Sequence, residues 1–199
     1  MQVENVHCVD RQLAESGGNC AIIPRMDAPI WVDTPASYQR MLASLRAEKQ
    51  LAVDTESNSL YAYRERVCLI QISTPTTDYL VDPFTMADLS TLGELFADPA
   101  VEKIFHAAEY DVICLKRDYG FQFENLFDTM LAARILGRSA VGLGSLLEEL
   151  FGIKLDKRYQ RDDWGQRPLP PALLAYARLD SHYLPALRER LAGELEKAG

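Results

Sequence analysis

The sequence predicts an α/β domain in which a mixed β-sheet is flanked by helices. Two observations lead to this class. Residues 51–82 hold three short apolar runs separated by turns, which is typical of a β-meander. The rest of the chain alternates between strand and helix and ends in helices. With 199 residues the chain is long enough for one domain with a substantial core, and short for two.

The first half of the predicted domain supplies four strands and two helices. IWV at 30–32 indicates a short strand, and the pair TP at 34–35 begins a helix as N-cap and first helical residue. LAVD at 51–54 and VCLIQIS at 67–73 indicate strands. DYLVD at 78–82 indicates another, joined to its predecessor as a hairpin through the turn PTT. A second helix follows from about 87 to 97.

The second half supplies one more strand and several helices. VEKIFHA at 101–107 indicates the strand, and EYDVICLKRDYG at 109–120 indicates a helix that ends at its glycine. Further helices are predicted over 129–137, over 142–153 and from 171 almost to the end. Pro185 should break or kink the last of these. Residues 1–28 have weak periodicity and are interpreted as an arm, so residues 29–199 form the domain.

Composition excludes several classes of protein. The net charge of −8 argues against coating nucleic acid by bulk electrostatics. No apolar run approaches the roughly 20 residues needed to cross a bilayer, so no membrane partner is expected. The polar, acid-containing first residues do not resemble a signal peptide. Four scattered cysteines predict a reduced, cytoplasmic protein and no structural zinc site. Phosphate-cradling and dinucleotide-binding glycine motifs are missing from the sequence.

Three short motifs carry the candidate chemistry. AVDTE places Asp54 and Glu56 two residues apart, on one face at the end of the predicted strand. Two such carboxylates repel unless a cation lies between them, although D-x-E also occurs where a strand simply runs into a polar turn. FHAAEYD places Asp111 in the first turn of a helix, where the dipole keeps an acid ionised. Glu109 competes with it, and only one should point at the site.

YARLD adds Tyr176 and Asp180, whose four-residue spacing puts both on one helix face. Alone, this pair could be a tyrosine capping an aspartate on a wet surface. Together the three motifs offer only carboxylate oxygens, which select Mg²⁺ or Mn²⁺. Two such ions about 4 Å apart would clamp a phosphodiester for in-line attack.

In this order and at these separations, AVDTE, FHAAEYD and YARLD resemble the DEDD superfamily of 3′–5′ exonucleases, in its tyrosine-type branch. Within that branch the chain is similar to ribonuclease D. Three further stretches support the resemblance: RVCLIQIS, LFDTMLAARIL and LDKRYQRDDWGQRPL. The likeness extends over about residues 30–190. It implies a ribonuclease H-like fold with a five-stranded mixed sheet, so that 29–199 would be the exonuclease domain. No C-terminal helical RNA-binding domain of the HRDC type is expected in this chain.

The resemblance also implies roles for the acids and the tyrosine. Asp54, Glu56 and Asp180 would hold the first of two divalent ions, Mg²⁺ or Mn²⁺. Asp54 would bridge to the second ion, with Asp111 acting mainly through its water. Tyr176 would orient the attacking water, because a phenol of pKa near 10 is a poor base at neutral pH.

Substrate contacts are predicted at several positions outside the acids. Thr55 lies between the first two acids, and Leu60 or Tyr61 would stack on the terminal base. His106 would lie near the scissile phosphate or the 3′ end, or would be a satisfied histidine at a strand end. Asp128 is interpreted as a helix cap rather than a ligand.

The segment 154–171 is the most basic and aromatic part of the chain, a composition that suits single strands. We expect Trp164 to be structural and Arg158 and Arg161 to lie near the substrate. Arg167 could serve either purpose.

These observations favour a 3′–5′ exoribonuclease that acts on single-stranded RNA 3′ ends and releases nucleoside 5′-monophosphates. One alternative is an exonuclease that acts on DNA with the same site, because the metal chemistry concerns phosphate and not sugar. Another is an inactive nucleic-acid-binding homologue, which predicts loss of at least one carboxylate. All four are present. The sequence indicates no oligomeric state.

Overall fold

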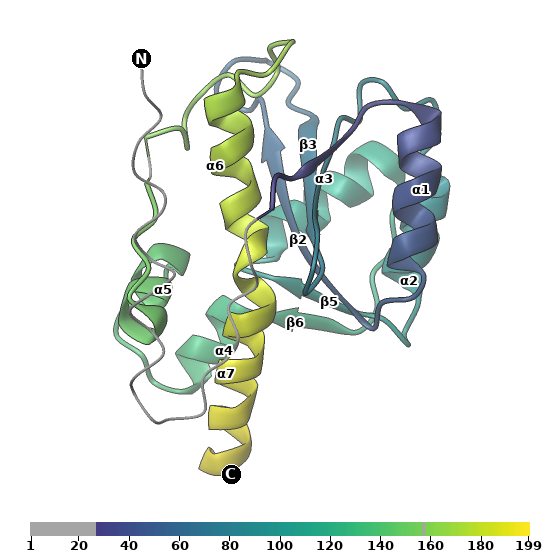
Figure 1. Cartoon of the computed structure of the whole chain (residues 1–199). Helices are drawn as coiled ribbons and strands as arrows, with labels where there is room; N and C mark the ends of the chain where they lie inside the picture. Colours follow the sequence, from purple (N-terminus) through teal and green to yellow (C-terminus); the bar gives the residue numbers. More distant parts are fainter. Residues whose placement is uncertain (1–26, 157) are drawn as a thin grey trace.

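The computed structural model describes residues 27–156 and 158–199 (Figure 1). The predicted arm therefore lies outside the described residues, apart from its last two positions. The described part forms a six-stranded sheet with helices on both faces. The strands are β1 (Ile30–Val32), β2 (Gln50–Ser57), β3 (Val67–Ser73), β4 (Asp78–Val81), β5 (Glu102–Phe105) and β6 (Leu126–Asp128).

The sheet is mixed, as the sequence predicts, and its spatial order is β1-β4-β3-β2-β5-β6. The central strands β2, β3 and β4 are antiparallel neighbours, with β3 and β4 joined as the expected hairpin. The remaining pairs, β1 with β4, β2 with β5 and β5 with β6, are parallel. The long β2 strand therefore lies where the antiparallel and parallel halves of the sheet meet.

Seven helices are present in the described part of the chain. They are α1 (Pro35–Leu45), α2 (Ser90–Ala97), α3 (Glu109–Tyr119), α4 (Thr129–Ile135), α5 (Leu143–Phe151), α6 (Pro171–His182) and α7 (Leu184–Ala198). Thr34 caps α1 by accepting a hydrogen bond from the Ser37 amide, with Pro35 at the first helical position, as predicted. Pro185 falls in the first turn of α7, so it divides the last helix as expected.

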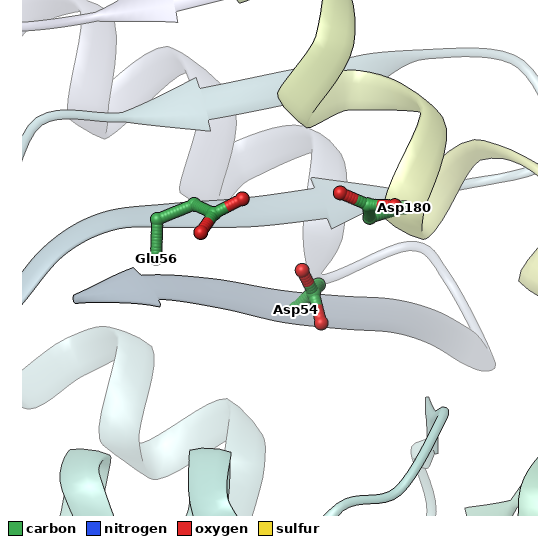
Figure 2. Close-up of side chains that lie close together, drawn as sticks. All are labelled: Asp54, Glu56 and Asp180. Carbon is green, nitrogen blue, oxygen red and sulfur yellow. The ribbon is translucent and has the colours of Figure 1, made fainter. Parts of the chain in front are cut away.

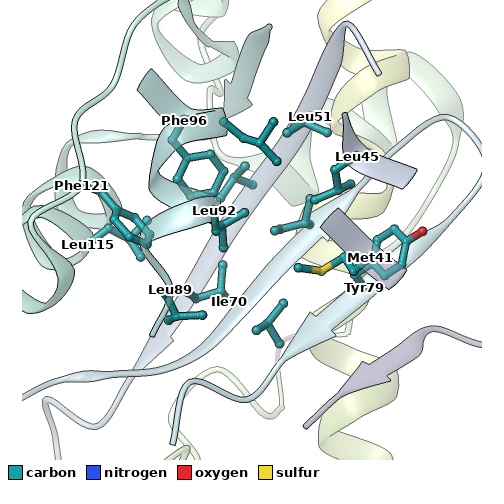
Figure 3. Close-up of a cluster of buried hydrophobic side chains, with 14 of the residues drawn as sticks. Met41, Leu45, Leu51, Ile70, Tyr79, Leu89, Leu92, Phe96, Leu115 and Phe121 are labelled. Carbon is teal, nitrogen blue, oxygen red and sulfur yellow. The ribbon is translucent and has the colours of Figure 1, made fainter. Parts of the chain in front are cut away.

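Apolar cores lie on both faces of the sheet. One, shown in Figure 3, joins α1, α2 and α3 to β2, β3 and β4, and it includes Leu45, Ile70, Leu92 and Phe96. On the other face α6 covers β2, β3 and β4, while α7 packs on β2 and β5. The site described below lies on this second face.

The structure corrects the sequence prediction at several strands. The sheet has six strands instead of five, because residues 126–128 add a short edge strand beside β5. Such a three-residue strand carries too little alternation to be recognised. Strand β2 continues to Ser57, and its register with β3 shifts between Glu56 and Ser57. The first two acids therefore lie within a paired strand and not beyond its end.

The strand predicted over 101–107 is shorter, because it ends at Phe105. In the described residues, none of the helices has the length and apolar character that crossing a membrane requires.

Candidate active site

Three acids from two distant parts of the chain meet on the α6 face of the sheet. Asp54 and Glu56 extend from β2, and Asp180 extends toward them from α6 (Figure 2). One carboxylate oxygen from each lies within 4.8 Å of the others. The i and i+2 spacing in a strand explains why the first two share a face. The cluster therefore contains the three acids that the family resemblance assigns as ligands of the first metal ion.

The three acids line a pocket of about 380 Å³. Six of the ten residues predicted for the site line it: Asp54, Thr55, Glu56, His106, Tyr176 and Asp180. The remaining wall comes from the start of α5 and from the segment before α6: Gly142, Leu143, Gly144, Leu155, Asp156 and Gln160, with Leu179 from α6. A pocket of this size, with carboxylates along one side, is better suited to binding a single nucleotide than to binding the surface of another protein.

Asp111 lies beside the cluster and does not line the pocket. Its carboxylate accepts a hydrogen bond from the Thr55 hydroxyl, and only 6% of its surface is exposed. Glu109 is exposed to solvent, so of the two competing acids in this turn it is Asp111 that points inward. Thr55 thus holds an acid in place as well as forming part of the wall.

The buried acids raise one another's pKa values. Desolvation raises the pKa of Asp54 well above its ordinary value, and the charges of Asp111, Asp180 and Glu56 raise it further. Glu56 is shifted in the same direction, first by desolvation and then by Asp180 and Asp111. Desolvation also raises the pKa of Asp111 to about 6 and that of Asp180 to about 7. Bound cations would offset the unfavourable burial of these negative charges. The site offers only oxygen ligands, which fit Mg²⁺ or Mn²⁺.

Tyr176 is held with its ring packed between aromatic neighbours. Its ring centroid lies 5.9 Å from that of Tyr159 and 6.1 Å from that of Trp164. Burial raises its pKa above the ordinary value, and the carboxylates of Asp180, Glu56 and Asp54 raise it further. The hydroxyl therefore stays protonated at neutral pH and can act as a hydrogen-bond donor in the pocket.

A buried polar network fixes α6 on the sheet. The Asp78 carboxylate on β4 accepts a hydrogen bond from the Ser73 hydroxyl at 2.7 Å and lies 2.9 Å from His182 Nδ1. The Arg178 guanidinium lies 3.2 Å from the same carboxylate. Ser181 contacts Ser73 at 2.8 Å. Because these α6 residues flank Asp180, the network fixes the position of α6 over the sheet and its rotation about its own axis.

Asp128 holds the turn that aims Asp111. Its carboxylate accepts hydrogen bonds from the Met130 and Leu131 amides at the start of α4, as the predicted cap. It also accepts from the amides of Ala107 and Ala108, at the entry to α3. Ala107 has φ of 63°, a left-handed conformation that is unfavourable for alanine. One carboxylate therefore stabilises two helix starts and a strained residue.

Replacing Asp128 with alanine should lower the free energy of unfolding by about 2–3 kcal/mol, from one lost cap and two lost charge-assisted hydrogen bonds. Urea denaturation of the metal-free protein measures this. Asp128→Asn keeps one acceptor oxygen and should lose less. A loss within ~0.5 kcal/mol for the alanine variant, as for an ordinary surface change, would contradict the role of this clamp.

His106 lines the pocket in a defined tautomer. The Thr129 hydroxyl donates to the Phe105 carbonyl at 3.0 Å, so its oxygen accepts from His106 Nδ1, which lies 2.9 Å away. Desolvation lowers the pKa of His106, which favours the neutral ring, although the charge of Asp128 acts in the opposite direction. The Nε2 atom of the neutral ring is then an acceptor.

The other predicted substrate residues do not line the pocket. Leu60 is 68% exposed, on the loop that follows β2. The Arg158 guanidinium is paired with Asp156 at 2.6 Å, and Arg161 is exposed with its carbonyl bound by the Tyr61 hydroxyl. Neither arginine lines the pocket, although Asp156 and Gln160 beside them do, and the expectation that both lie near the substrate stays a prediction.

Two residues of the segment 154–171, Trp164 and Arg167, have structural roles. Trp164 is 2% exposed, as expected for a core residue. Arg167, which the sequence left open, forms two hydrogen bonds with Asp82 and one with the Cys68 carbonyl. Its task is therefore to anchor the loop to the sheet.

The pocket wall formed by residues 142–144 and by Gln160 was not predicted from the sequence. The sequence predicts a helix that starts at residue 142, but nothing in the spacing of Gly142 and Gly144 indicates that this start faces the acids. Gln160 lies between Arg158 and Arg161, and an uncharged side chain between two arginines carries no signal of its own.

These features define a class: a nuclease with a ribonuclease H-like sheet and a carboxylate site shared between its central strand and a late helix. A model of the 3′–5′ exonuclease family matches residues 29–196. The chain therefore belongs to the 3′–5′ exonuclease family of the DEDD superfamily, as a homologue of RRP6 and ribonuclease D.

The relatives support this assignment. The chain is 42% identical over 168 residues to the exosome complex exonuclease RRP6 of Saccharomyces cerevisiae, covering 84% of this chain and 23% of that protein. It is 39% identical to protein RRP6-like 3 of Arabidopsis thaliana, covering 90% of this chain and 20% of the relative. The chain thus spans about a fifth of the length of these relatives.

Solved structures agree. Ribonuclease D of Escherichia coli superposes with a TM-score of 0.82 at 31% identity, covering 87% of this chain and 46% of that one. The catalytic core of RRP6 from Trypanosoma brucei superposes with a TM-score of 0.78 at 33% identity, covering 86% of this chain and 50% of that one.

Proposed function

We propose that this protein is a two-metal-dependent 3′–5′ exoribonuclease that removes nucleoside 5′-monophosphates one at a time from single-stranded RNA. The observation that carries the proposal is the meeting of Asp54, Glu56 and Asp180 within 4.8 Å at the wall of a nucleotide-sized pocket. Two Mg²⁺ or Mn²⁺ ions at such a site would lower the pKa of water and stabilise the charge on the departing oxygen.

The residues of the chain have separate tasks in this proposal. Asp54, Glu56 and Asp180 would hold the first cation, with Asp54 shared with the second and Asp111 acting through water. Tyr176 keeps its proton and donates a hydrogen bond that orients the attacking water. The phenol is not the base, because its surroundings raise its pKa.

The pocket also supports a preference for RNA. Neutral His106 offers its Nε2 acceptor at the pocket wall, which suits a ribose hydroxyl that DNA lacks at the 2′ position. The similar ribonuclease D of Escherichia coli is described as an exoribonuclease involved in structured RNA processing. tRNA 3′ processing or RNA turnover would then be the setting. The cytoplasm fits as a reducing compartment, because Cys68 and Cys114 are free thiols.

A labelled-substrate assay tests the function. A 5′-labelled single strand, as RNA or DNA and with a free or phosphate-blocked 3′ end, is incubated with Mg²⁺ or Mn²⁺. We expect a ladder of products shortened from the free 3′ end of RNA, and no reaction in EDTA. Activity in EDTA, or shortening from the 5′ end, would contradict the proposal. Equal or faster degradation of DNA would favour the DNA exonuclease instead.

A further inference from the structure

Gln71, in the middle of β3, has a buried amide with no hydrogen-bond partner. Its side chain is 0% exposed, and neither Nε2 nor Oε1 has a partner among the described residues. Leaving such groups unpaired in a protein interior is costly, and apolar residues of similar shape would avoid the cost. An amide retained in this position therefore needs an explanation other than packing.

The register of the sheet places Gln71 directly beside the acid cluster. Gln71 is the cross-strand partner of Asp54, in the antiparallel ladder between β2 and β3. Directly opposed residues in such a ladder point to the same face, with Cβ atoms about 5 Å apart. Gln71 thus lies on the face that carries Asp54 and Glu56, beneath the helix α6 that carries Asp180.

Neighbouring positions on the same face of β3 have different surroundings. Leu69, opposite Glu56, is apolar and packs with Trp164. Ser73 is polar and is fully engaged with Asp78 and Ser181. Gln71, between them, is therefore a polar residue whose groups are free for a partner that arrives in the adjacent site.

We propose that Gln71 is a positioning residue of the metal site, whose Nε2 donates a hydrogen bond to the carboxylate of Asp54 when that carboxylate binds a cation. This inference rests on the proposed metal-dependent function. A hydrogen bond from a neighbouring residue fixes the orientation of a carboxylate that binds a metal. Residues that do not bind the metal themselves commonly hold its ligands in this way. One oxygen of Asp54 is then held by the protein and the other is directed into the pocket.

The proposal predicts opposite effects on stability and on metal binding. Gln71→Leu removes the unpaired amide, so the metal-free protein in EDTA should melt at the same or a higher temperature. Its affinity for Mn²⁺, measured by titration calorimetry, should fall about 10–100-fold. Ile72→Val, on the same strand but facing the opposite core, is the matched control and should keep the wild-type Mn²⁺ affinity.

Each outcome decides one question. If wild-type protein binds Mn²⁺ and Gln71→Leu binds it equally well, Gln71 has no positioning role while the proposed function stands. A Gln71→Leu protein that loses stability in EDTA but keeps its Mn²⁺ affinity would make Gln71 structural and overturn the inference. If the wild type binds no Mn²⁺ and degrades no RNA, the metal-dependent function itself fails. Should the leucine variant not fold, Gln71→Met, which has a similar length and flexibility, carries the same comparison.

Discussion

Replacing Asp54 with asparagine should reduce turnover of RNA by on the order of 10³-fold or more, because removing one preorganised charged group from a reaction centre has effects of this size. Asp54 lies centrally among the acids, and the charges of Asp111, Asp180 and Glu56 all act on it. Single-turnover degradation of a 5′-labelled RNA, with metal in excess, measures the loss. Glu94→Gln removes the same charge from an exposed position on α2 and should leave the rate unchanged. An Asp54→Asn protein with near wild-type turnover would remove Asp54 from the catalytic site.

The same substitution should stabilise the protein when metal is removed. In the folded state the pKa values of Asp111 and Asp180 rise from 3.8 to about 6 and about 7. The folded protein therefore holds protons more tightly than the unfolded chain, so stability from this source is full below pH 4 and is lost as the pH rises through about 7. Asp54→Asn removes part of the repulsion. Its melting temperature in EDTA at pH 8 should exceed that of the wild type, and its decline with pH should be shallower. A lower melting temperature would show that Asp54 stabilises the metal-free fold.

Tyr176→Phe should lower kcat roughly 10²-fold, a size expected for loss of one aligned hydrogen-bond donor. The substitution removes only the hydroxyl, while the ring keeps its contacts with Tyr159 and Trp164. KM and the melting temperature should therefore stay close to the wild-type values.

Steady-state degradation of a short RNA over a range of pH separates the possible roles of the tyrosine. Because the pKa of Tyr176 is raised, the wild-type rate should show no loss of activity from its ionisation near pH 10. A fully active Tyr176→Phe protein would contradict the positioning role. A variant with raised KM and unchanged kcat would instead assign the hydroxyl to substrate binding.

The acids of this site could be predicted from the sequence because the three motifs together resemble those of the DEDD exonucleases, while strand and helix periodicity explain which of them share a face. Asp54 and Glu56 share a face by the two-residue repeat of a strand, and Tyr176 and Asp180 share one by the helical turn. The motifs do not predict the register in which β2 pairs with β3, because register depends on contacts between residues that are distant in the sequence. Gln71 therefore escaped notice, although it stands within one of the matching stretches.

The positions of the charged residues in the sequence do not indicate which other residues line the pocket. Arg158 and Arg161 are cations in an acidic chain, yet neither lines the pocket: Arg158 pairs with Asp156, and Arg161 is exposed to solvent. The wall at 142–144 is Gly-Leu-Gly, which contains no charged or titratable group that would mark it as part of a site. Strand β6 was missed for a related reason, because three residues cannot establish an alternating pattern.

The division of the acids between β2 and α6 has a consequence for protein synthesis. A ribosome that has released only the first 170 residues has delivered Asp54, Glu56 and Asp111, but neither Tyr176 nor Asp180. The six strands of the described part lie within these residues, whereas the proposed active site is incomplete without α6. A chain that ends before residue 171 therefore lacks two of the five residues proposed for the site, and we expect it to cleave no RNA.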